Sequence, residues 1–271
     1  MPTAIPYWHI DAFAARPFAG NQAAVMRLDT WPDDAVLQAI AAENLFAETA
    51  FIVPDAGGAA DWELRWFAPR MEVRLCGHAT LASAHVLLGL EPGRDSVRFR
   101  TRRAGLLEVR RQGRGYELAL PAIATRPAAW PETVAALGDA PREVHAAAGG
   151  YHVFLYDSER QVRALRPDMG ALAGLSGDGQ FIVTAPGGEA DVVSRVFAPG
   201  VGVDEDSVTG SAHAVLTPFW AARLGRPNFT AYQASARGGH LSCRLDGDRV
   251  WLGGDCATVV EGWFHLQGVT P

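Results

Sequence analysis

The sequence Arg-Trp-Phe-Ala-Pro at residues 65–69 returns as Arg-Val-Phe-Ala-Pro at residues 195–199. Each stretch is typical of a short apolar strand that a proline ends. A glycine follows ten to thirteen residues after the phenylalanine, Gly77 in the first half and Gly210 in the second, and opens a helix of small and apolar side chains. A hairpin pattern containing arginine comes next in both halves. The shared order predicts a duplication that gives two similar α/β domains with a cleft between them.

The duplication also places the expected domain boundary. Residues 121–131 are rich in alanine and proline and are interpreted as a linker. We therefore expect an N-terminal domain over residues 1–124 and a C-terminal domain over residues 125–271. The small-residue helices, at residues 79–88 and from 210 to about 224, are expected to be buried on most sides.

The composition excludes several classes of protein. All 24 basic side chains are arginine, so a lysine Schiff base and a Walker A phosphate loop are both excluded. A net charge of −6 argues against nucleic acid or an anionic membrane as the partner. The eight arginines between residues 94 and 114 alternate with apolar positions, so we expect them on the solvated face of a sheet.

The cysteine count and the hydropathy pattern indicate a soluble cytoplasmic protein. The three cysteines, Cys76, Cys243 and Cys256, lack a framework spacing, so we expect reduced thiols. The N-terminal residues show no basic region followed by an apolar one, so no signal peptide is expected. The longest apolar stretch, around residues 79–90, falls short of the roughly 20 residues that span a bilayer.

The two helix openings are the first candidates for chemistry. A helix N-terminus presents unpaired N–H groups and the positive end of a dipole. Gly77 and Gly210 leave these groups open to a ligand because glycine has no Cβ. If the openings faced each other across the cleft, they would hold a carboxylate or stabilise an enolate beside one. The alternative is that both glycines only start helices.

Titratable or polar side chains flank both openings. Cys76 and His78 flank the first, Asp206 precedes the second, and Thr209 and Ser211 stand on either side of it. Such groups beside a helix N-terminus suit acid–base chemistry. The spacings Cys-x-x-Cys, His-x-His and His-Glu-x-x-His are absent from the sequence, so we expect no metal site.

Glu48 is the candidate general acid and base. It lies between a helix expected to end near Asn44 and an apolar strand at residues 49–53. A carboxylate there can face a cleft while its neighbours are buried, and desolvation would favour its protonated form. The alternatives are that Glu48 only caps the turn, or that it is solvated and Glu43 is the important acid.

A set of short motifs runs in one order along nearly the whole chain: Asp-Ala-Phe (11–13), Pro-Phe-Ala-Gly-Asn (17–21), Glu-Thr-Ala-Phe (48–51), Arg-Trp-Phe-Ala-Pro (65–69), Cys-Gly-His-Ala-Thr (76–80), Glu-Asp-Ser-Val-Thr-Gly-Ser-Ala-His (205–213) and Gln-Ala-Ser-Ala-Arg-Gly-Gly (233–239). Together they resemble the phenazine biosynthesis-like (PhzF) family. The resemblance implies an α/β (α+β) fold shared with diaminopimelate epimerase. That fold has two similar domains, each a curved, mostly antiparallel sheet wrapped around a central helix, with the active site between them.

The resemblance also implies a homodimer that needs no cofactor, and it allows the last strand, at about residues 258–266, to return to the N-terminal domain. The isomerase of the family moves a proton along its substrate with one glutamate, and Glu48 matches that position. Of the other candidates, His78, Asp206 and Ser211 match positions that line the site, and Asn21, Gly77 and Gly210 match polar and backbone contacts there.

The chain departs from the wider superfamily at one position. Racemases and epimerases of this fold pair two cysteines, whereas here Cys76 takes the first place and Thr209 the second. A threonine hydroxyl is too weak an acid to replace a thiol near neutral pH. We therefore do not expect the two-thiol mechanism. We expect both residues to contact the substrate.

We therefore expect a cofactor-independent isomerase that moves a proton between carbons of a small carboxylate substrate. Glu48 would carry the proton, while His78 and Asp206 would position the substrate. Two alternatives stay open. One is an epimerase or racemase that uses Cys76 as one of its bases, and the other is a small-molecule-binding or scaffold protein without turnover.

Overall fold

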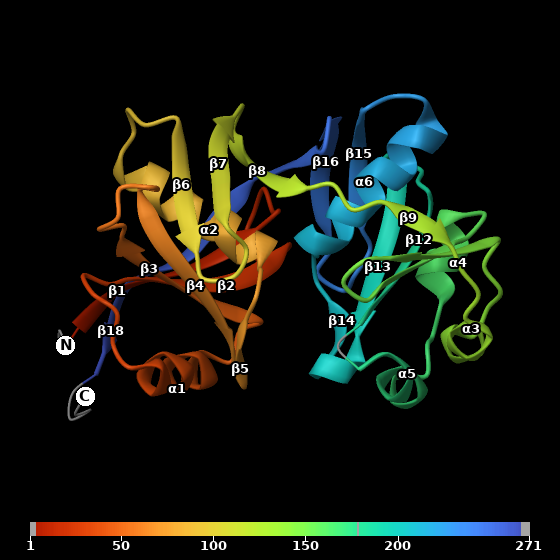
Figure 1. Ribbon diagram of the computed structural model, residues 1–271, viewed down its shortest axis with the longest axis horizontal. Coiled ribbons are helices and arrows are strands. Elements are labelled where there is room, and N and C mark those ends of the chain that lie inside the picture. Colours follow the sequence, from red (N-terminus) through yellow and green to blue (C-terminus); the bar gives the residue numbers. More distant parts are fainter. Residues whose placement is uncertain (1–3, 178, 267–271) are drawn as a thin grey trace. The chain divides into compact units, whose positions relative to one another are not determined.

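The computed structural model describes residues 4–177 and 179–266, and the chain divides into two compact units (Figure 1). The first unit comprises Met1–Ala119 and Gly253–Pro271, and the second comprises Leu120–Leu252. The boundary lies just before the one expected after residue 124. The C-terminal segment, which contains the strand that the resemblance allowed to return to the N-terminal domain, is grouped with the first unit. Both units combine helices with parallel and antiparallel strand pairs, so the protein is of the mixed α/β class.

The first unit has a mixed sheet, with strands β1 (Ala4–Ala12), β2 (Asn21–Arg27), β3 (Glu48–Pro54), β4 (Trp62–Ala68), β5 (Met71–Val73), β6 (Ser96–Thr101), β7 (Leu106–Gln112), β8 (Gly115–Pro121) and β18 (Cys256–His265). β1 pairs antiparallel with β2, β2 parallel with β3, and β3 antiparallel with β4. β4 pairs parallel with β6, which continues antiparallel into β7 and β8. The last strand, β18, pairs antiparallel with β1.

The second unit repeats this topology with β9 (Thr125–Pro127), β10 (Glu143–Ala147), β11 (Tyr151–Leu155), β12 (Gln180–Pro186), β13 (Val192–Ala198), β14 (Val203–Asp206), β15 (Asn228–Gln233), β16 (Gly239–Asp246) and β17 (Arg249–Gly254). β10–β11 is antiparallel, β11–β12 parallel, β12–β13 antiparallel, β13–β15 parallel and β15–β16 antiparallel, which repeats the first unit step for step. β9 flanks β10 as β18 flanks β1. Residues 121–131 are therefore not a plain linker, because part of this segment is a strand.

One helix in each unit is buried on nearly every side. α2 (Gly77–Leu90) is buried without interruption from Gly77 to Ala84, and α6 (Gly210–Leu224) is buried over most of its length. α2 lies among the strands of its own unit and contacts β1, β2, β3, β6 and β7 (Figure 1). Small side chains make this possible, because they let the strands approach the helix closely. The burial predicted from the sequence is confirmed, and it holds the first turn of each helix in a fixed place.

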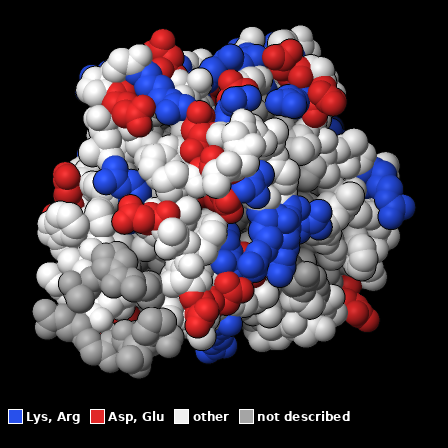
Figure 2. All heavy atoms as spheres, turned by 60° about the vertical axis from the view of Figure 1, so that its left-hand side comes forward, with Lys and Arg blue, Asp and Glu red and all other residues white. Residues whose placement is uncertain are grey.

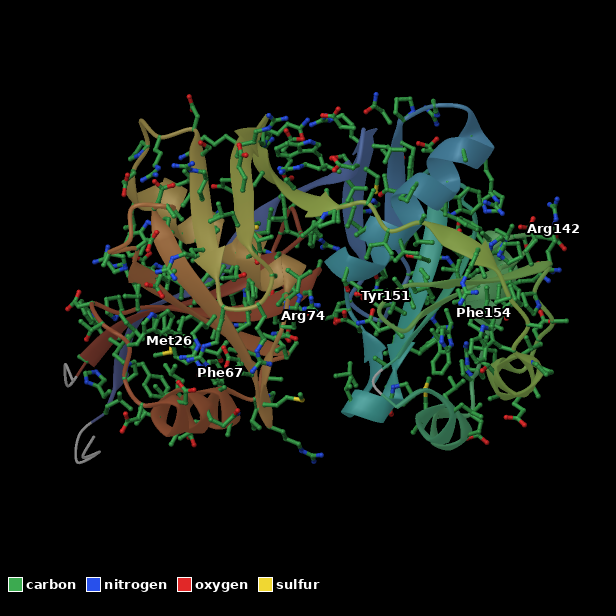
Figure 3. All side chains as sticks on the ribbon, viewed as in Figure 1. Met26, Phe67, Arg74, Arg142, Tyr151 and Phe154 are labelled. Carbon is green, nitrogen blue, oxygen red and sulfur yellow. The ribbon has the colours of Figure 1, made fainter. Side chains whose placement is uncertain are left out.

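The remaining helices cover the outer side of each unit's core: α1 (Asp34–Asn44), α3 (Pro131–Leu137), α4 (Glu159–Ala164), α5 (Met169–Ser176) and the short 3-10 helix η1 (Pro199–Val201). α1 closes a core of the first unit that contains Met26 and Phe67, while Phe154 belongs to the corresponding core of the second (Figure 3). Within the described residues, the helices are too short or too polar to cross a bilayer.

The repeated Arg-x-Phe-Ala-Pro motif has a structural reason. Arg65 of β4 is only 6% exposed and donates to both carboxylate oxygens of Glu72, over 2.8 and 3.0 Å. Arg195 of β13 does the same with Glu205, over 2.7 and 2.9 Å. In both strands the guanidinium also lies over the ring of the phenylalanine two residues later, at 5.0 and 4.9 Å from its centroid. The motif therefore encodes a bidentate ion pair stacked on an aromatic ring in each unit.

Several of the arginines between residues 94 and 114 have acidic partners. Arg100 pairs with Asp55 at 2.7 Å, and Arg110 pairs with Glu117. Figure 2 shows acidic and basic side chains next to one another over this view of the surface. Pairing of this kind cancels part of the local positive charge.

Candidate functional site

Glu48 is the first residue of β3, where it lies opposite Ala23 of β2 in a parallel pair. The turn before it is tight, because Leu45 ends α1 in the left-handed region at φ 56°. That conformation is rare for a side chain of this size and costs about 1 kcal/mol or more. The strained turn ends α1 and starts β3 within three residues, and it leaves the Glu48 side chain 19% exposed.

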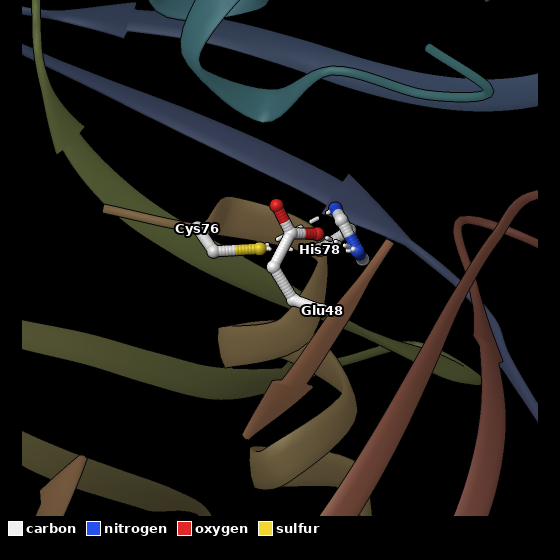
Figure 4. Close-up of side chains that lie close together, drawn as sticks. All are labelled: Glu48, Cys76 and His78. Carbon is white, nitrogen blue, oxygen red and sulfur yellow. Dashed lines mark hydrogen bonds and ion pairs between the residues drawn. The ribbon is translucent and has the colours of Figure 1, made fainter. Parts of the chain in front are cut away.

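His78 is the second residue of α2 and is the partner of Glu48 (Figure 4). Its Nε2 lies 3.1 Å from Oε2 of Glu48, and its side chain is 6% exposed. Its other ring nitrogen, Nδ1, lies 3.1 Å from the carboxamide nitrogen of Asn21, at the start of β2. Asn21 is itself buried. The imidazole is therefore held at both nitrogens by side chains that begin neighbouring strands.

Cys76 is the residue that precedes α2, and its backbone is extended there. Its sulfur lies 3.5 Å from Nδ1 and 3.8 Å from Nε2 of His78. Burial, together with the negative charge of Glu48, raises the pKa of the Cys76 thiol to about 11. Cys76 is therefore a neutral thiol at physiological pH.

The surroundings of the His78 imidazole raise its pKa. Burial alone lowers its pKa, but the adjacent Cys76 sulfur and the Glu48 carboxylate outweigh burial and raise the pKa of His78 well above 6.5. Cys76 is an uncharged thiol at neutral pH, so at that pH the negative charge of the Glu48 carboxylate is what raises the pKa of His78. A protonated His78 needs an acceptor at Nδ1, and the Asn21 carboxamide supplies one when its oxygen faces the ring.

One carboxylate oxygen of Glu48, Oε2, is buried without a well-aligned hydrogen bond from the described residues. Nε2 of His78 is within hydrogen-bond distance of it, but the angle is unfavourable. The first N–H groups of α2 have no intrahelical acceptor either, and no side chain caps this helix. A buried carboxylate beside open N–H groups can accept a proton from a ligand whose negative charge the helix end stabilises.

The corresponding opening in the second unit contains a closed hydrogen-bond ring. The hydroxyl of Thr209 donates to Oδ2 of Asp206 over 2.6 Å. Gln233 accepts from the backbone N–H of Thr209 over 2.9 Å and donates to the backbone oxygen of Asp206 over 2.8 Å. Gly210 and Ser211 are the first two residues of α6, with Gly210 buried and Ser211 partly buried.

The structure thus divides the predicted site residues between two groups. Asn21, Glu48, Cys76, Gly77 and His78 lie together in the first unit, whereas Asp206, Thr209, Gly210 and Ser211 lie together in the second. Sequence reasoning missed the role of Gln233, which is fully buried and fixes the second group. A signal for it existed, because a glutamine at the end of an apolar strand is seldom buried without a polar partner.

The first group also contains three side chains of the kinds that bind metal ions. One ligand atom each from Glu48, Cys76 and His78 lies within 4.8 Å of the other two. Sequence spacing could not reveal this set, because Glu48 comes from β3 and the other two from the start of α2.

Comparisons with known proteins agree with this architecture. The phenazine biosynthesis-like protein family matches residues 10–262. An uncharacterised isomerase of Pseudomonas aeruginosa is 48% identical over 266 residues, which cover 97% of this chain and 99% of that protein. A crystal structure of a PhzF-family phenazine biosynthesis protein from Enterococcus faecalis has a TM-score of 0.90 and 40% identity, covering 97% of this chain and 100% of that one.

The fold extends to more distant enzymes. A hydroxyproline epimerase from Agrobacterium vitis has a TM-score of 0.64 at 14% identity, covering 97% of this chain and 93% of that one, which is a likeness of fold alone. The family resemblance predicted from the short sequence motifs is confirmed by these matches. The chain belongs to the phenazine biosynthesis-like (PhzF) family.

Proposed function

We propose that the protein is a cofactor-independent isomerase that moves a proton between two carbons of a small carboxylate substrate. The name isomerase, carried by the relative at 48% identity, supports the class of reaction. The observation that carries the mechanism is the position of Glu48. Its buried Oε2 atom, to which no described residue makes a well-aligned hydrogen bond, lies 3.1 Å from Nε2 of His78 in the first turn of a buried helix.

In the proposed reaction, the Glu48 carboxylate takes a proton from one carbon of the substrate. The electron pair of that C–H bond moves into the conjugated system beside the substrate carboxylate and forms an enolate-like anion. The N–H groups at the start of α2 and the His78 cation stabilise this negative charge. While the anion is bound, the proton on Glu48 exchanges with solvent, because its side chain is 19% exposed. Glu48 then delivers a proton to a different carbon, so the substrate is isomerised, solvent hydrogen enters it and the carboxylate is regenerated.

The second group of residues is proposed to act on the same substrate. Asp206 is fixed by its short hydrogen bond from Thr209, and Ser211 stands in the first turn of α6. A fixed carboxylate and a hydroxyl can orient a polar substituent of the substrate, and the start of α6 favours its carboxylate.

The homodimer and the cytoplasmic location stay predictions.

The test begins with a search for the substrate. The protein is incubated in D₂O with a panel of small unsaturated carboxylic acids, and mass spectrometry identifies the acid that gains deuterium. With that acid, Glu48→Gln should lower kcat on the order of 10²-fold or more with little change in KM, because the amide keeps the shape and loses the base. The matched control is Glu43→Gln, since Glu43 is an exposed acid five residues earlier. Wild-type turnover in Glu48→Gln would remove Glu48 from the mechanism.

A second candidate function is a one-cysteine epimerase, which the closeness of Cys76 to His78 favours. The raised pKa of the thiol argues against Cys76 as a base at neutral pH. Cys76→Ser should therefore keep most of the deuterium exchange, and complete loss in a folded variant would favour the epimerase instead. A binding protein without turnover is the third candidate. It would predict no exchange with any acid that binds.

A further inference from the structure

We propose that Glu48, Cys76 and His78 form a binding site for Zn²⁺, and that the bound ion holds the protein in an inhibited state. The three side chains converge from two elements, β3 and the start of α2 (Figure 4). Each supplies one ligand atom, and the three atoms lie within 4.8 Å of one another. Among the residues that the structure describes, this is the one cluster of three such ligands.

Two of the distances between the donor atoms are close to those around a tetrahedral ion. Zinc bonds of about 2.0–2.3 Å at the tetrahedral angle place ligand nitrogen and oxygen atoms about 3.4 Å apart, and nitrogen and sulfur atoms about 3.6 Å apart. Oε2 of Glu48 is 3.1 Å from Nε2 of His78, and the Cys76 sulfur is 3.8 Å from the same nitrogen. The sulfur is nearer to Nδ1 of His78, at 3.5 Å, so the Cys76 side chain must also turn toward the side of Nε2 that faces Glu48 when the ion binds.

The chemistry of the donors selects a borderline or soft cation. A thiolate, an imidazole and a carboxylate are the ligands of Zn²⁺, whereas Mg²⁺ and Ca²⁺ require oxygen atoms. On binding, the Cys76 thiol and the His78 imidazolium release their protons to solvent, and the lone pairs that held them bind the ion. Three protein ligands leave the fourth tetrahedral position to water.

The surroundings support coordination through Nε2 of His78. A metal-bound histidine usually donates its other N–H to an oxygen that fixes the ring. The buried Asn21 side chain lies 3.1 Å from Nδ1 and provides that oxygen when its carboxamide turns. In addition, the buried Oε2 of Glu48 receives no well-aligned hydrogen bond from the described residues, so an ion would satisfy an atom that the protein leaves open.

Inhibition follows from the ligand set and rests on the proposed function. An ion bound to Oε2 of Glu48 occupies the lone pair that would take the proton from the substrate. It also neutralises the His78 cation, since the nitrogen that binds the metal cannot carry a proton. Zinc and substrate should therefore compete. Binding of the ion by itself does not depend on what the protein catalyses.

The test measures binding first. Chelator-treated full-length protein is titrated with ZnCl₂ in a calorimeter, and with CoCl₂ in a spectrophotometer that detects thiolate-to-cobalt charge transfer. We expect one Zn²⁺ per chain and a charge-transfer band. Cys76→Ser and Glu48→Gln should each weaken zinc binding by about 100-fold or more, since loss of a neighbouring partner alone costs 10–100-fold. Cys256→Ser removes a thiol outside the cluster and should bind as the wild type does.

Several results would overturn the site. These are an absent charge-transfer band in the wild type, a stoichiometry far below one, or equal zinc affinity in wild type and Glu48→Gln. The cobalt spectrum needs no variant, so a Cys76→Ser protein that fails to fold leaves the test intact. Zinc bound at the cluster without loss of turnover would overturn the proposed inhibition, whereas turnover that depends on Glu48 in a protein that binds no zinc would contradict the metal site alone.

Discussion

Acid should destabilise this protein through His213, a buried histidine in α6. Its side chain is fully buried, Nδ1 donates to the Thr209 carbonyl over 2.8 Å, and Nε2 lies 3.5 Å from the Ser194 hydroxyl. Burial lowers the pKa of His213 from 6.5 to about 4. The unfolded chain therefore takes up this proton first as the pH falls. The contribution of His213 to the free energy of unfolding is retained above pH 6.5 and falls by about 1.4 kcal/mol per pH unit below it. The total loss reaches roughly 3 kcal/mol at pH 4.

The assay is urea unfolding of the wild type and of His213→Asn at several pH values between 7.5 and 4. Asparagine can still donate to the Thr209 carbonyl but does not titrate, so it isolates the histidine's proton. The variant should be less stable at pH 7, and the difference between the two proteins should shrink by about 3 kcal/mol on acidification to pH 4. Stability curves that stay parallel over this range would refute the reasoning, because they would mean that the proton binds equally well to both states.

Two further predictions concern the fold. Gly20→Ala should destabilise the first unit by well over 1 kcal/mol, because φ is +64° and a Cβ would lie 2.1 Å from a backbone oxygen, whereas Gly58→Ala, at φ +68° with open space around it, should cost only about 1 kcal/mol. Equal losses in urea unfolding would contradict the steric argument. Arg195→Met should cost about 3 kcal/mol by breaking a largely buried bidentate pair, whereas Arg142→Met, at an exposed pair 4.0 Å apart (Figure 3), should change stability by less than about 1 kcal/mol. Similar thermal shifts in the two variants would count against the role of the repeated motif.

The duplication could be predicted from the sequence because the two halves make the same contacts with the same types of residue. Arg65 and Arg195 recur at one spacing from a phenylalanine and a proline, and both form the same stacked ion pair. The buried helices were also predictable, since long runs of small residues leave no polar face. Three site residues could also be named from the sequence, because each stands at the start of an element whose apolar pattern is clear: Glu48, Cys76 and His78.

The rest depends on tertiary contacts that leave little trace in a local pattern. β9 lies in a segment rich in alanine and proline, and it is a strand only because β10 lies beside it. β14 consists largely of acidic residues, and it pairs with β13 while Glu205 binds Arg195. The convergence of three metal-type ligands likewise arises from the parallel pairing of β2 with β3 and from the position of α2, neither of which sequence spacing reveals.

The claim on which the account depends is that one carboxylate, that of Glu48, carries the migrating proton. The most direct measurement is the rate at which solvent deuterium enters the substrate in the Glu48→Gln variant, compared with the wild type and with Glu43→Gln. We predict that exchange falls at least about 100-fold in Glu48→Gln and stays unchanged in Glu43→Gln. Exchange at the wild-type rate in a folded Glu48→Gln protein would contradict the claim.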